Sequence, residues 1–128
     1  MDKTLLVIEN DEALVDVVSF AFSEAGWTVH SACDGNEGVE LAIEHKPAAI
    51  ICDVIMDKMH GFDVLRTLRA HPETKHTVII VTSAKAYKPD IDRARELGAT
   101  DYVVKPFRTD ELMSLVERHL ATPRELEP

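Results

Sequence analysis

Polar side chains that could act together follow four of the apolar runs in this chain. The groups are Glu9–Glu12 after Leu5–Ile8, Asp53 after Ala48–Cys52, Thr82 and Ser83 after Val78–Val81, and Lys105 with Pro106 after Tyr102–Val104. Clustered carboxylate and amide oxygens suit a hard cation such as Mg²⁺. A lysine ammonium and a threonine hydroxyl suit the acceptor oxygens of a phosphoryl group. An aspartate among them can be metal ligand and nucleophile at once, as in aspartyl-phosphate chemistry.

The elements that must position these groups are indicated by the apolar pattern. The runs are continuous rather than alternating, which predicts strands buried on both faces of a parallel sheet, and Trp27–Ala32 is a fifth, weaker run. Apolar residues at helical spacing separate the runs, and the first such set is Leu14, Val17, Val18, Ala21, Phe22 and Ala25. Five strand–helix units are too few for a closed eight-stranded barrel. The sequence therefore predicts an open, doubly wound α/β sheet.

The ends of the predicted helices carry ordinary stop and start signals. Gly26 and Gly98 are placed to end the first and fourth helices, and prolines follow the second and third. Thr109 is the predicted N-cap of the last helix, with Asp110 and Glu111 on the positive end of its dipole.

In an open α/β sheet, ligands bind beyond the carboxyl ends of the strands, so the four polar groups should converge at one edge. Each group alone has a simpler explanation. An aspartate after a strand commonly forms a turn, and Glu9–Glu12 could be a solvated helix start. The prediction of a site rests on finding such groups at the same end of four different strands.

The composition limits the classes of function. The 128 residues, 45% of them hydrophobic, fit one domain, and the net charge of −9 argues against direct nucleic-acid binding. No apolar run approaches the length of a membrane helix, so we expect a soluble, cytoplasmic protein without a membrane segment. Cys33 and Cys52 have no metal-ligand spacing and are interpreted as reduced thiols. The predicted domain covers residues 1–121, and Thr122–Pro128 is interpreted as a tail or the start of a linker.

Four stretches of the chain, LLVIENDEAL, IICDVIMDKMHGFDVL, IIVTSA and GATDYVVKPF, resemble in order and spacing the receiver domain of two-component response regulators. The resemblance covers residues 4–121. It implies a flavodoxin-like (βα)5 fold with strand order 2-1-3-4-5 and helices on both faces of the sheet. It also implies a phosphorylation-activated signalling domain rather than an enzyme, which accepts a phosphoryl group from a histidine kinase, a phosphotransfer protein or a small phosphodonor.

The resemblance assigns roles to individual residues. Asp53 would be the phosphoacceptor, and Mg²⁺ would be held by Glu9, Asn10, Asp53 and the backbone carbonyl of Ile55. Lys105 would contact the phosphoryl oxygens, and a cis peptide bond between Lys105 and Pro106 would aim the lysine. Thr82 and Tyr102 would form the switch. The output surface would be the fourth helix, fifth strand and fifth helix, roughly Tyr87–Leu120, which could serve a homodimer or an effector.

Two residues depart from the family pattern. Asn10 stands where the family usually has a second aspartate, which predicts weaker Mg²⁺ binding because the amide carries no charge. Asp57 stands where the family usually has a proline. An alternative is therefore a pseudo-receiver, which would act as a protein-interaction module without phosphorylation. Ile55 and Ala84 offer no group to orient a water, which predicts slow hydrolysis of the phosphorylated form.

Overall fold

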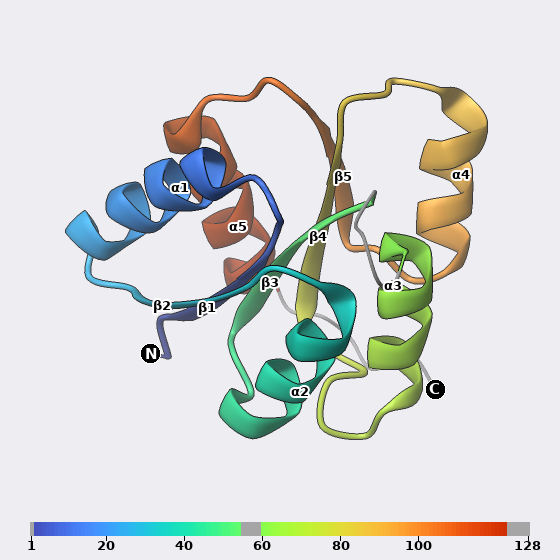
Figure 1. The fold of residues 1–128 in the computed structure, drawn as a ribbon, viewed down its shortest axis with the longest axis horizontal. Helices are drawn as coiled ribbons and strands as arrows, with labels where there is room; N and C mark the ends of the chain where they lie inside the picture. The colour runs from blue at the N-terminus through green and yellow to red at the C-terminus, as the bar shows by residue number, and fades with distance from the viewer. Residues whose placement is uncertain (1, 55–59, 123–128) are drawn as a thin grey trace.

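The fold alternates strands and helices along the whole described chain (Figure 1). The structure, a computed structural model, describes residues 2–54 and 60–122. The strands are β1 (Thr4–Ile8), β2 (Thr28–Ala32), β3 (Ala49–Asp53), β4 (Val78–Ser83) and β5 (Asp101–Val104). The helices are α1 (Glu12–Glu24), α2 (Gly35–His45), α3 (Gly61–Ala70), α4 (Lys88–Glu96) and α5 (Thr109–Ala121). Neighbouring strands pair in parallel in the order β2-β1-β3-β4-β5, as predicted.

The sheet separates two apolar cores, which explains why the strand sequences are continuously apolar. In β1, Leu5 and Val7 pack toward α1 and α5, while Leu6 and Ile8 pack toward α2, α3 and α4. All four side chains are at most 1% exposed. Alternate residues of a strand point to opposite faces, so a strand covered on both faces needs an apolar residue at every position.

Two predictions about the helices were wrong in detail. The N-cap of α5 is Arg108 rather than Thr109, because the backbone is extended at Arg108 and its carbonyl accepts the first helical bond, from Leu112. Val17 was assigned to the buried face of α1 by its spacing, yet its side chain is 55% exposed. Val17 lies about 100° around the helix from the buried Val18, which places it beyond the edge of the core-facing stripe.

The predicted helix stops are confirmed by the backbone. Gly26, after α1, and Gly98, after α4, adopt φ of 92° and 105°, a left-handed conformation in which a side chain would be strained. No helix within the described ranges is long and apolar enough to cross a membrane.

Candidate functional site

The predicted polar residues meet at the carboxyl end of the sheet. Glu9 directly follows β1, Asp53 is the last residue of β3, and Lys105 directly follows β5. Thr82 lies in β4 and pairs in register with Asp53. Parallel strands bring these positions to one edge although they are far apart in the sequence, as the topology of the fold requires.

Two buried carboxylates and one ammonium form the centre of the site. Glu9 is 4% exposed and Asp53 is 7% exposed. The Nζ of Lys105 lies 2.8 Å from Oε1 of Glu9 and 3.5 Å from Oδ1 of Asp53. The other carboxylate oxygen of Glu9, Oε2, accepts a hydrogen bond of 3.0 Å from the backbone N–H of Asp11. One cation can therefore contact both carboxylates at once.

The electrostatics of the site keep Lys105 charged. Burial is the largest single influence on its pKa and acts to lower it. The hydrogen bond from Lys105 to Glu9 and the negative charges of Asp53 and Glu9 together outweigh burial, so the pKa of Lys105 is raised above its ordinary value. Lys105 is thus an ammonium at physiological pH, and the peptide bond between it and Pro106 is cis.

Asn10 and Asp11 take different positions at the start of α1. The Asn10 residue is exposed, whereas Asp11 is the N-cap of α1, its Oδ1 accepting a bond of 3.3 Å from the N–H of Leu14. The Asp11 side chain therefore caps the start of the helix. Ile55 and Asp57 lie outside the described residues.

Thr82 and Tyr102 lie on neighbouring strands in different surroundings. Thr82 is 1% exposed, next to Asp53 across the sheet. The hydroxyl of Tyr102 donates a hydrogen bond of 3.0 Å to the carbonyl of Lys85, in the loop between β4 and α4. Tyr102 thus connects β5 to the loop that follows the Thr82 strand.

Gly61 supports the backbone around Asp53, and the sequence analysis gave it no such role. Its N–H donates a bond of 2.7 Å to the carbonyl of Val54, while the N–H of Val54 donates to the carbonyl of Thr82. A Cβ on Gly61 would meet the backbone oxygens of Asp53 and Val54 far inside contact distance. A glycine at the start of a helix after the Asp53 strand was the signal available in the sequence.

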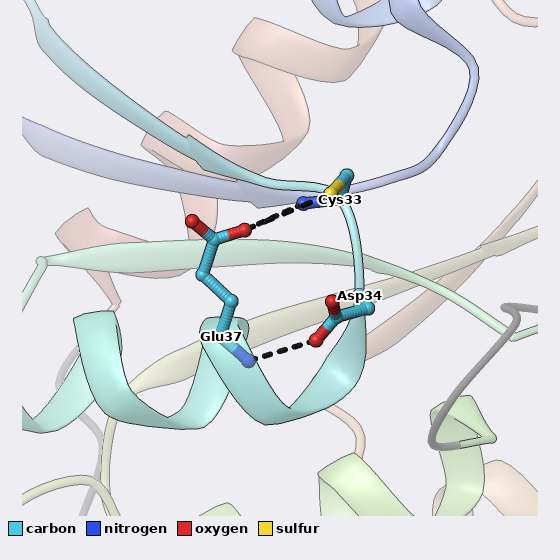
Figure 2. Close-up of side chains that lie close together, drawn as sticks. All are labelled: Cys33, Asp34 and Glu37. Atoms are coloured by element: carbon cyan, nitrogen blue, oxygen red, sulfur yellow. Dashed lines mark hydrogen bonds between the residues drawn. The ribbon is translucent and has the colours of Figure 1, made fainter.

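A second group of possible metal ligands, Cys33, Asp34 and Glu37, lies at the start of α2 (Figure 2). Its hydrogen bonds explain it as a helix cap. Asp34 accepts a bond of 2.9 Å from the N–H of Glu37, and Glu37 reaches back to accept one of 3.1 Å from the N–H of Cys33. This closely resembles the reciprocal capping box that commonly begins a helix, so the group has a structural role.

Comparison with known proteins agrees with this geometry. The chain matches the family model of the response regulator receiver domain over residues 5–117, and it belongs to that family. A putative response regulator from Chloroflexus aurantiacus is 30% identical, with a TM-score of 0.89 over 95% of this chain and 100% of the other. The chemotaxis protein CheY4 of Vibrio cholerae is 27% identical, with a TM-score of 0.87 over 92% of this chain and 98% of the other.

A third structure shares the fold at lower identity. The receiver domain of a sensor histidine kinase from Pseudomonas aeruginosa is 24% identical, with a TM-score of 0.87 over 95% of this chain and 100% of the other. That protein was crystallised with a magnesium ion coordinated in its active-site cleft. Receiver domains as a class are phosphorylated on aspartate with Mg²⁺ and interact with histidine kinases and phosphotransfer proteins.

Proposed function

We propose that this chain is a phosphorylation-activated receiver domain, over residues 1–121, in which Asp53 accepts a phosphoryl group in a Mg²⁺-dependent reaction. The phosphoryl donor is a cytoplasmic histidine kinase or a phosphotransfer protein. The single observation that carries this proposal is the ammonium of Lys105 lying 2.8 Å from Glu9 and 3.5 Å from Asp53. These contacts place a fixed positive charge beside the proposed acceptor.

The donor set fits Mg²⁺. Glu9 and Asp53 provide two nearly buried carboxylates that already share one cation, the Lys105 ammonium, and Asn10 adds an amide oxygen. Hard oxygen ligands in small number are what Mg²⁺ uses in proteins, with water completing its shell. Glu9, Asn10, Asp53 and the carbonyl of Ile55 would hold the ion. When bound, Mg²⁺ would neutralise negative charge on the transferred group.

The transfer itself needs little from the protein beyond position and charge. A carboxylate oxygen of Asp53 forms a bond to phosphorus, the bond from phosphorus to the donor's imidazole nitrogen breaks, and that imidazole takes up a proton. Lys105 moves from the carboxylates to the phosphoryl oxygens, where its charge stabilises the product. The hydroxyl of Thr82, whose position in β4 pairs with Asp53, would donate a further hydrogen bond after a local shift.

We assign the output to the surface formed by α4, β5 and α5, which would bind an effector or a second copy of the domain. Tyr102 is the link to this surface, because its hydroxyl bonds to Lys85 in the loop between Thr82 and α4. Movement of Thr82 toward the phosphoryl group would pull on this loop, and new contacts at the site would bias the position of α4.

Intact-protein mass spectrometry after incubation with acetyl phosphate tests the proposal. We expect one phosphoryl adduct that requires Mg²⁺, disappears with a chelator, and is absent from Asp53→Asn. A lack of adduct in the wild-type protein at every Mg²⁺ concentration would refute the proposal. It would favour the pseudo-receiver, since Asn10 removes one carboxylate from the site, and restoration of the adduct by Asn10→Asp would identify that cause.

A further inference from the structure

The guanidinium of Arg69, in the last turn of α3, connects α3 to the loop before β4 and to the turn between α4 and β5. Its Nε donates a hydrogen bond of 2.8 Å to the carbonyl of Gly98. Its Nη2 donates one of 3.3 Å to the hydroxyl of Thr100, and its Nη1 donates to the carbonyls of Thr74 and Lys75, each at 3.1 Å. All of these acceptors precede β4 or β5, so Arg69 acts at the edge of the sheet opposite the candidate site.

The turn after α4 is also bound to the sheet. The hydroxyl of Thr100 accepts a hydrogen bond of 3.0 Å from the N–H of Ile79 in β4, and the N–H of Thr100 donates one of 2.8 Å to the carbonyl of Ile79. A Cβ on Gly98 would lie 2.8 Å from Cγ of Arg69, so only a residue without a side chain lets this turn pass so close to the arginine. The C-terminal end of α4 is therefore held by both α3 and β4.

The N-terminal end of α4 is held by fewer contacts. Residues 84–89, which form the preceding loop and the first residues of the helix, are all exposed. The N-cap residue, Tyr87, is 61% exposed, and within the described part of the chain its side chain makes no capping hydrogen bond. Of the residues of α4, all of which the structure describes, Ala94 in the second half is the buried one. Segments with few buried contacts are the ones that move at the lowest cost in free energy.

We propose that Arg69 makes the C-terminal end of α4 a fixed pivot, so that α4 responds to the candidate site by tilting about Gly98 while its N-terminal end moves. This step rests on the proposed function, in which the loop that follows Thr82 carries the signal. That loop enters α4 at the end with the fewest buried contacts. A displacement of the loop therefore moves the first turn of α4, while the hydrogen bonds of Gly98 and Thr100 to Arg69 stay in place.

The pivot divides α4 into a moving end and a fixed end. Binding can shift an equilibrium between two states only through contacts that differ between those states. A partner that distinguishes the phosphorylated chain therefore contacts the first turn of α4, where Lys88 is exposed. Arg95 and Glu96, which are exposed in the last turn, keep their places in both states and contribute equally to binding in each.

Amide hydrogen exchange of the full, unphosphorylated chain tests the attachment of α4 by itself. We expect Arg69→Met to lower the protection of the Gly98 and Ala99 amides about tenfold, the effect of losing a hydrogen bond from a charged donor. Protection is measured relative to Ile51 in the central strand β3, whose exchange reports global unfolding. Arg66→Met, which removes an exposed arginine one turn earlier on α3, is the matched control and should change neither amide. Equal protection in Arg69→Met and Arg66→Met would overturn the proposal.

Two-dimensional NMR spectra recorded with Mg²⁺ and acetyl phosphate test the tilt. In the wild type we expect the signals of residues 87–92 to shift and those of residues 97–100 to stay in place. In Arg69→Met, but not in Arg66→Met, the signals of residues 97–100 should shift as well. Equal shifts at both ends of α4 in the wild type, or one pattern in both variants, would overturn the pivot. A wild-type chain with no adduct by mass and no shifted signals would refute the phosphoacceptor and the tilt together, while hydrogen exchange would still decide whether Arg69 holds α4.

Discussion

Replacing Lys105 by methionine should tighten the binding of Mg²⁺. In the structure the ammonium of Lys105 contacts Glu9 and Asp53, the two carboxylates proposed to hold the metal ion, at 2.8 and 3.5 Å. Binding of a metal ion through Oε1 of Glu9 would therefore compete with the Lys105 ammonium. Methionine keeps the length and apolar stem of lysine but does not compete for the carboxylates.

The size of the change in Mg²⁺ affinity follows from the lost hydrogen bond between Lys105 and Glu9. A hydrogen bond between charged groups contributes about 1.5–3 kcal/mol. The released Lys105 side chain regains hydration because it is 22% exposed, so the lower end of that range applies. The dissociation constant of Mg²⁺ should fall roughly tenfold, which corresponds to about 1.4 kcal/mol. Lys105→Arg, which keeps the charge, should bind Mg²⁺ about as weakly as the wild type.

Isothermal calorimetry of Mg²⁺ binding measures this directly and does not depend on phosphorylation. Lys85→Met, in the exposed loop after β4, is the matched control and should not change the affinity. Urea unfolding of Lys105→Met must show a cooperative transition, since removal of one partner leaves two buried carboxylates uncompensated. Unchanged or weaker Mg²⁺ binding by a folded Lys105→Met would refute the competition between lysine and metal.

Three further predictions concern the packing of Gly61, the buried thiol of Cys52 and the lifetime of the phosphorylated protein. Gly61→Ala should lower the free energy of unfolding by about 2 kcal/mol or more, because the new Cβ meets the backbone of Asp53 and Val54. Gly38→Ala should cost less, because the atoms nearest its Cβ belong to the Ile8 side chain, and equal costs in urea unfolding would contradict this reason. Burial raises the pKa of the Cys52 thiol far above its ordinary value, so unfolding releases a proton above pH 8.5 or so. The unfolding free energy should then fall by about 1 kcal/mol between pH values of about 8 and 9.5, relative to Cys52→Ala, and an equal pH dependence of the two proteins would show that the thiol is not responsible. Because Ala84 offers no acid, base or amide to orient water, the phosphorylated protein should persist well beyond seconds at neutral pH, as followed by intact mass, and decay within seconds would show the reasoning from this residue to be wrong.

Much of the fold could be predicted from the sequence because strands that are buried on both faces have continuous runs of apolar residues. The residues of β3 and β4 are all buried, and a continuous apolar run is the pattern that such strands must have. The outer strand β5 is half-buried, and its Val104 is 36% exposed, yet its sequence is equally apolar. Apolar residues therefore predicted that β5 is a strand but not that it lies at an edge.

In the helices, the spacing of apolar residues did not predict which of them are exposed. Val17 fits the i, i+3, i+4 spacing of the α1 core stripe, and only packing shows that it faces outward. Phe20 was not part of the predicted stripe, and its exposure could not be read from its type. The exposure of Val17 and Phe20 could therefore not be predicted from their spacing or their type.

The candidate site was predictable in outline, because parallel topology brings the ends of β1, β3, β4 and β5 to one edge. The pairing of Glu9 with Lys105 was not, since it depends on the rotamers of two long side chains separated by most of the sequence. Gly61 was missed for a similar reason. Its contribution is the absence of a side chain against the backbone of Asp53, which is a property of the folded chain alone.

Asn10 makes the site less negative, which increases the relative contribution of the Lys105 ammonium to its charge. The carboxylates in contact with Lys105 are Glu9 and Asp53, so the three groups together carry one negative charge, where an aspartate at position 10 would bring a second nearby. A less negative site attracts Mg²⁺ less strongly, but it also repels an anionic phosphoryl donor less. Asn10→Asp should therefore strengthen Mg²⁺ binding. At low Mg²⁺ concentration, we expect it to raise the rate of phosphorylation by a smaller factor than the affinity for Mg²⁺. A Mg²⁺ titration of adduct formation separates the two effects. With the neutral amide at position 10, the fixed ammonium of Lys105 supplies the larger share of the positive charge that faces the donor.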